Sequence, residues 1–174
     1  MRLVALGLLC VPVFAQDAVH DALLKHWKTS AELTIQVAKA MPGESYGFKP
    51  VPEEMSFGQL MDHIAAANLG ACAAASGMPR PAMPEKIAAS VKDQKAPEPD
   101  KDSIIAFMSD TFSFCEKAVE SMTPEKLNAV AGPANRKMTG FEWLWAYFTH
   151  TAHHPGQAEV YLRLKGITPP PYTF

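Results

Sequence analysis

The chain lacks two patterns that define other protein classes. No segment alternates apolar and polar residues in the way that predicts a half-buried β-strand. The apolar run at residues 3–14 is shorter than the roughly 20 residues that a membrane-spanning helix needs, and no later run is longer. These absences exclude a β-rich fold and a stable membrane span in the chain that follows residue 15.

Positive charge is scarce as well. Sixteen Lys and Arg residues stand against 18 Asp and Glu residues, which gives a formal net charge of −2. Proteins that bind nucleic acid carry a basic stripe that neutralises phosphates, and this chain has none. We therefore expect no nucleic-acid partner.

Cysteine is rare, and no CxxC motif is present. Cys72 and Cys115 both fall on apolar faces of predicted helices, where a free cysteine packs as a small apolar residue. We expect two buried free thiols there. A disulfide between them, which an exported protein could form, is the less favoured alternative.

The first fifteen residues have the features of a secretory signal peptide. Arg2 precedes the apolar run, and small residues occupy the −3 and −1 positions before Gln16. Cleavage after Ala15 would leave residues 16–174 as one domain. We expect this domain to be exported, to the periplasm or the extracellular space.

Four long segments have the apolar spacing of three and four residues that predicts amphipathic helices. They are Asp17–Met41, Ser56–Ser76, Asp100–Met122 and Thr139–Lys165. The second and fourth begin with capping boxes, in which a Ser or Thr is followed three residues later by Gln or Glu. Proline-rich connectors separate the first three helices, and the second connector has room for a short helix at residues 85–94. We predict an all-α, four-helix bundle, and the length of that connector permits the third helix to run parallel to the second.

Histidines in two of these helices suggest a metal site. His150 and His154 are one helical turn apart on one face, and Gln157 follows on the same face. Two imidazoles at this spacing can bind one divalent cation. His63, in the second predicted helix, is the best candidate for a third ligand. The alternative is that all three are ordinary surface or core histidines.

With these residues placed, the chain resembles the DinB-like (DinB/YfiT-like) superfamily of metal-dependent four-helix-bundle proteins. The resemblance rests on residues 56–63 (SFGQLMDH), 150–157 (HTAHHPGQ) and 162–170 (LRLKGITPP). It implies an up-down-down-up bundle, and His63, His150 and His154 as metal ligands. The family pattern has a basic residue where this chain has Pro155, so that either the helix bends at the site or a positive charge is lost.

Three neutral imidazoles with an open fourth position are typical of a catalytic metal site. Zn²⁺ is the first choice for such a site, and Ni²⁺ or Fe²⁺ accept the same ligands. Gln157, His153 and Asp62 are candidates for orienting a ligand or the substrate. His153 points about 60° away from the direction of His150. No residue is assigned a catalytic role.

Two functions from different classes are compatible with these residues. The first is a metal-dependent hydrolase that acts on an unidentified small molecule through metal-bound water. The second is a non-catalytic bundle that binds a metal or a small ligand. A thiol-dependent S-transferase, which the resemblance also implies, would require a cytoplasmic protein. The aromatic residues at 143, 145, 147 and 148 fit either the core or a homodimer interface.

Overall fold

The computed structural model describes residues 13–172, with side chains from residue 18 onward. The predicted signal peptide lies outside the described residues except for its last three, so its cleavage stays a prediction. None of the helices in the described part of the chain has the length and apolar character of a membrane-spanning segment.

Four long helices form the bundle, and shorter elements connect them. The long helices are α1 (Val13–Ala40), α2 (Phe57–Ser76), α4 (Lys101–Glu120) and α6 (Gly140–Leu164). The connectors contain a 3-10 helix η1 (Gly43–Ser45), the short helices α3 (Glu85–Lys92) and α5 (Pro124–Asn128), and the strands β1 (Val130–Ala131) and β2 (Met138–Thr139).

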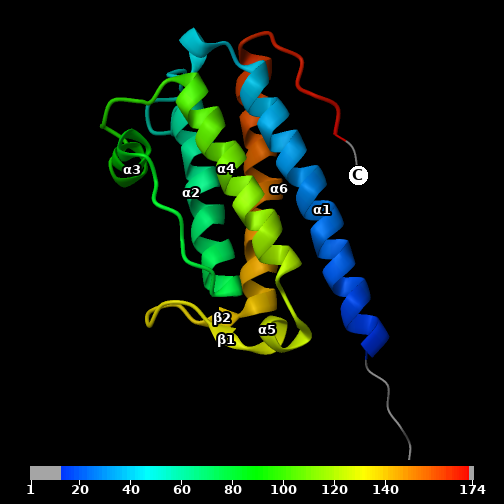
Figure 1. Cartoon of the computed structure of the whole chain (residues 1–174). Coiled ribbons are helices and arrows are strands. Elements are labelled where there is room, and N and C mark those ends of the chain that lie inside the picture. Colours follow the sequence, from blue (N-terminus) through cyan, green and yellow to red (C-terminus); the bar gives the residue numbers. More distant parts are fainter. Residues whose placement is uncertain (1–12, 173–174) are drawn as a thin grey trace, which may run out of the picture.

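The helices follow an up-down-down-up order, as predicted. Figure 1 shows α1 and α6 running upward and α2 and α4 running downward. α1 and α2 each pack against both α4 and α6, so α1 and α2 lie diagonally opposite one another. The long connector through α3 returns the chain to the top of the bundle, which is why α4 runs parallel to α2 (Figure 1).

Local signals set the ends of the helices. The Oγ of Ser56 accepts a hydrogen bond from the Gln59 amide at 3.1 Å, and the Oγ1 of Thr139 accepts one from the Glu142 amide at 3.2 Å. Both predicted capping boxes are therefore confirmed. Gly77 ends α2 with a φ of 72°, a left-handed conformation that glycine adopts without strain.

The structure corrects two predicted elements. α1 already includes Val13, the first described residue, and so extends beyond the predicted start at Asp17, because no residue between them stops a helix. Two short strands pair Val130 with Thr139 and Ala131 with Met138, where the sequence analysis predicted no strand. Strands of two residues are too short to produce an alternating pattern.

Cys72 and Cys115 form a disulfide that joins α2 to α4, so the preference for free thiols is wrong. Their Cα atoms lie 5.3 Å apart, within the range that a disulfide can span. Apolar periodicity places each cysteine on an inner face, but it does not say which residues of two helices meet. That pairing depends on how the alanine-rich α2 packs against α4.

The aromatic residues at the start of α6 divide between the core and the surface. Trp143 is buried, whereas the side chain of Trp145 is 52% exposed. Trp145 stacks on Phe141 and lies next to Phe148, on the side of α6 that faces α1. A homodimer through this exposed face stays a prediction.

Removing the disulfide should lower the stability of the fold. The bond closes a segment of 43 residues, so a Cys72→Ala/Cys115→Ala variant should lose about 2–4 kcal/mol of unfolding free energy, mainly because its unfolded chain is less restricted. Urea unfolding with and without reductant measures this difference. Reductant should destabilise the wild-type protein and leave the variant unchanged. An equal response of both proteins would contradict the bond.

Candidate metal centre

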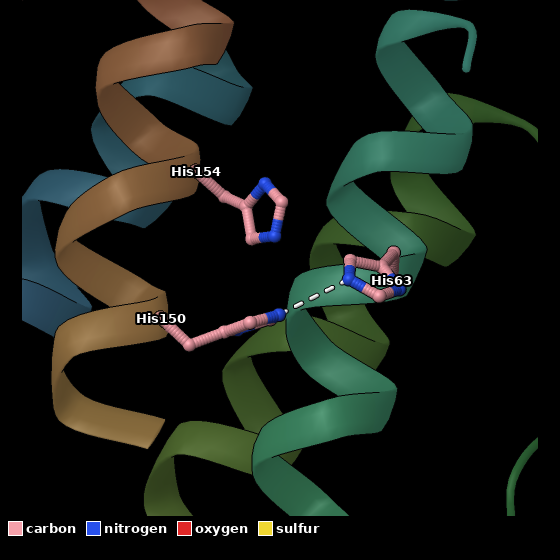
Figure 2. Close-up of side chains that lie close together, drawn as sticks. All are labelled: His63, His150 and His154. Atoms are coloured by element: carbon pink, nitrogen blue, oxygen red, sulfur yellow. Dashed lines mark hydrogen bonds between the residues drawn. The ribbon is translucent and has the colours of Figure 1, made fainter. Parts of the chain in front are cut away.

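Three histidine side chains meet between α2 and α6. His63 extends from α2, while His150 and His154 extend from successive turns of α6, with α1 and α4 behind them (Figure 2). One ring nitrogen from each residue lies within 4.8 Å of the others, and the Nε2 atoms of His63 and His150 are 3.1 Å apart. The structure thus brings together the three residues that the resemblance implied as ligands.

A buried pair of polar residues sets the register of the two helices at this point. The Nδ2 of Asn68 on α2 donates a hydrogen bond to the Oγ1 of Thr151 on α6 at 2.8 Å, and the same side-chain amide donates to the backbone oxygen of Ile64. Both side chains are buried. This pair was not predicted from the sequence, where the one available signal was a polar residue inside the alanine-rich second helix.

Burial keeps the three imidazoles uncharged at neutral pH. Loss of solvent lowers the pKa of His63, His150 and His154, and the neighbouring histidines lower it further, to about 4 for His150. A metal binds only the neutral imidazole, because the protonated ring has no free lone pair. The cluster is therefore in the form that a cation requires.

Gln157 orients His154. Its Oε1 lies 3.0 Å from the Nδ1 of His154. An amide oxygen can only accept a hydrogen bond, so Nδ1 carries the proton and the lone pair of Nε2 is left for the cluster. The Nδ1 of His150 is buried and has no such partner. The ring of His150 is instead held by packing next to Tyr147, with centroids 5.5 Å apart.

Comparison with known proteins identifies the family of this chain. The family model of the DinB superfamily matches residues 26–158. The chain belongs to the DinB superfamily. No curated protein sequence matches it.

Solved structures of this superfamily share the fold. The DinB-like protein YjoA of Bacillus subtilis is 22% identical with a TM-score of 0.68, and covers 87% of this chain and 97% of its own. A DinB-like protein of Bacillus cereus ATCC 10987 is 21% identical with a TM-score of 0.70, covering 88% and 97%. YfiT of Bacillus subtilis, described as a probable metal-dependent hydrolase with an unusual four-helix bundle topology, is 12% identical with a TM-score of 0.66, covering 93% and 94%.

Pro155, where the chain departs from the superfamily pattern, does not face the histidines. α6 continues as a helix through this residue. Pro155 is buried and lines a cavity between α1 and α6, together with His26 and Phe148. A basic residue at this position would therefore face α1 rather than the histidine cluster.

The other two candidate residues lie outside the cluster. His153 is exposed, and its ring is 4.8 Å from that of His154. Asp62 is fully buried on the side of α2 that α3 covers, and neither carboxylate oxygen has a hydrogen-bond partner. Its neighbours there are Ser90, whose buried hydroxyl likewise has no hydrogen-bond partner, and Glu98. The expectation that Asp62 orients a ligand is therefore not supported.

Burial raises the pKa of Asp62 to about 7, with nearby Ser90 lowering it in part and Glu98 raising it. Because the folded-state pKa is raised, this carboxyl group favours the fold at low pH, and that contribution is lost as the pH rises through 7. In metal-free protein, Asp62→Asn should raise the unfolding free energy at pH 8 by up to about 4 kcal/mol, and have little effect near pH 4.

Urea unfolding between pH 4 and 8 in the presence of a chelator measures this effect. Asp110→Asn, at an exposed position on α4, is the matched control and should leave the pH profile unchanged. A loss of stability at pH 8 in Asp62→Asn would show instead that the fold requires the ionised carboxylate.

Proposed function

We propose that this DinB-superfamily protein binds a divalent cation through His63, His150 and His154, and hydrolyses a small-molecule substrate there. The observation that carries the proposal is the approach of three uncharged imidazoles, from two helices, to within 4.8 Å of one another. Three nitrogen ligands leave a coordination position for substrate or solvent, as in catalytic zinc sites. We expect the bound cation to be Zn²⁺, and the metal analysis below would also detect Ni²⁺ or Fe²⁺, which accept the same ligands.

The residues of the chain supply binding and orientation. A bound cation would lower the pKa of coordinated water and polarise an acyl oxygen of the substrate. His63 contributes from α2 and the other two ligands from α6, so the site depends on the packing of these helices. Gln157 keeps His154 in the required tautomer. No Asp or Glu belongs to the cluster in the described chain, so the proposal includes no carboxylate general base.

We also propose that the protein works outside the cytoplasm. The disulfide between Cys72 and Cys115 supports this location, because disulfides persist mainly in oxidising compartments. The apolar N-terminal run after Arg2 is a second, independent argument. Since small cytosolic thiols are scarce outside the cell, export favours a hydrolase over a thiol-dependent S-transferase.

Metal content tests the ligand set. Purified protein should contain close to one divalent cation per chain by elemental mass spectrometry, and His63→Ala and His150→Ala should each lose most of it. His153→Ala is the matched control, since it removes an exposed histidine next to the cluster and should retain the metal. Wild-type protein that binds no metal after reconstitution would overturn the proposal.

Hydrolysis is tested separately with a panel of ester, amide and phosphodiester substrates. Metal-loaded wild-type protein should turn over at least one class, and chelation should abolish this activity in a way that added metal reverses. Tight metal binding without turnover of any class would favour the non-catalytic binding function.

Gln157→Ala should weaken metal binding without preventing it. Loss of the acceptor for the Nδ1–H of His154 leaves the ring free to adopt the wrong tautomer or orientation, which typically lowers metal affinity about 10- to 100-fold. Competition with a chromogenic chelator measures the affinity. Gln157→Glu, which keeps an acceptor at the same position, should retain most of it. Equal affinities of Gln157→Ala and the wild-type protein would mean that packing alone orients His154.

A further inference from the structure

Arg136 lies on the loop between β1 and β2, at the edge of the face of α6 that carries the histidine cluster. We propose that Arg136 binds the substrate and that the substrate carries a carboxylate group. This inference rests on the proposed function, because it names the chemical class of molecule that the same site would take.

The loop that carries Arg136 is held against α6. The Nε1 of Trp143 donates a hydrogen bond to the backbone oxygen of Ala131 at 3.1 Å, which fixes the start of the loop. Gly132 follows with a φ of 105°, and a Cβ atom there would lie 2.7 Å from the Trp143 ring and 2.6 Å from the backbone oxygen of Arg136. Only glycine allows the loop to pack this closely. The amide of Arg136 then closes a turn onto Pro133 at 3.0 Å.

Two aromatic rings hold the guanidinium group. The Cζ of Arg136 lies 5.1 Å from the ring centroid of Trp143 and 5.5 Å from that of Tyr147. These two rings stack on each other with centroids 5.8 Å apart. The Nη1 of Arg136 also donates a hydrogen bond to the hydroxyl of Tyr147 at 3.0 Å. The guanidinium is therefore oriented before any ligand arrives, which reduces the entropy lost on binding.

Tyr147 links Arg136 to the histidines. Trp143, Tyr147, His150 and His154 follow one another at spacings of four, three and four residues, so they share one face of α6. The centre of the Tyr147 ring lies 5.5 Å from the centre of the His150 ring, and also 5.5 Å from the Cζ of Arg136. Tyr147 therefore contacts both groups, and these two distances place the Cζ of Arg136 no more than about 11 Å from the ring centre of His150.

Arg136 makes no ion pair among the described residues, as is true of most Lys and Arg residues there, since Lys28 and Arg163 are the ones that pair with glutamates. What sets Arg136 apart is its contact with two stacked aromatic rings, which hold the guanidinium without neutralising its charge. The side chain is exposed, and among the described residues one of its five N–H donors meets a protein acceptor. The remaining donors form the planar fork that binds a carboxylate with two parallel hydrogen bonds. A substrate held there by its carboxylate would reach the histidine cluster with its far end, provided that the molecule spans the separation set by Tyr147.

Binding of simple carboxylates tests the inference without knowledge of the substrate. We would titrate Zn²⁺-loaded protein with acetate, malonate, succinate and glutarate by calorimetry, and metal-free protein by its tryptophan fluorescence, to which Trp143 contributes. At least one dicarboxylate should bind the loaded protein more tightly than acetate does. Arg136→Ala should weaken this binding about tenfold or more, and Arg136→Lys, which keeps the charge but loses the fork, should weaken it less.

Lys137→Ala is the matched control, because it removes a neighbouring exposed cation that no aromatic ring holds, and it should bind as the wild-type protein does. Equal losses in Arg136→Ala and Lys137→Ala would show general electrostatic attraction and overturn the inference. Unchanged binding in Arg136→Ala, with its metal content intact, or no binding of any carboxylate to the wild-type protein, would also overturn it. Carboxylate binding that depends on Arg136 in a protein that takes up no metal would support the inference while rejecting the proposed function.

Discussion

The hydrogen bond between Asn68 and Thr151 is the constraint on which the rest of the site depends. It joins α2 and α6 inside the core, where an unpaired amide or hydroxyl group would be costly. A shift of one helix past the other by a single turn, about 5.4 Å, would break this interhelical bond and leave each side chain with only its bond inside its own helix, to the backbone oxygen of Ile64 or Tyr147. Because Thr151 is next to His150, the bond that aligns the helices also aligns the histidines. This polar pair therefore adds to apolar packing in fixing one register of α2 against α6.

α2 contacts the helices α3, α4 and α6 of the structure. One side of it carries His63 towards α6, and another is joined to α4 through the Cys72–Cys115 disulfide. A third side, with Asp62, lies under α3. The position of His63 thus depends on contacts with three other helices. These contacts suit the role proposed for His63, a metal-ligating side chain that has to stay at a fixed distance from His150 and His154 on α6.

Burial affects the titrating groups on α2 and α6 in opposite directions. It lowers the pKa of the three histidines, so their contribution to stability is lost as the pH falls below about 6.5 towards 4 in the metal-free protein. It raises the pKa of Asp62, whose contribution is lost as the pH rises through 7. The bundle therefore carries an uncharged site in its interior at neutral pH, with the free positive charge of Arg136 outside it. Uncharged histidines that could bind a metal, together with the oriented guanidinium of Arg136, fit the anionic substrate that we propose.

The sequence alone determined the features that depend on residues close together in the chain. Capping boxes, the left-handed glycine after α2 and the spacing of His150 and His154 all act within about one helical turn, so the four helices and the paired histidines could be predicted. The up-down-down-up order required the family resemblance in addition, and the resemblance supported His63, already the best candidate for the third ligand. Only the tertiary structure decided which side of α2 faces each neighbour, and therefore that Cys72 meets Cys115 and that Asp62 lies away from the histidines. The tertiary structure also brought Arg136 into contact with Tyr147. The β1–β2 hairpin that carries Arg136 has strands too short to give an alternating pattern of apolar and polar residues. These contacts join residues far apart in the sequence, and their geometry follows from the rotation and register of packed helices rather than from any local signal.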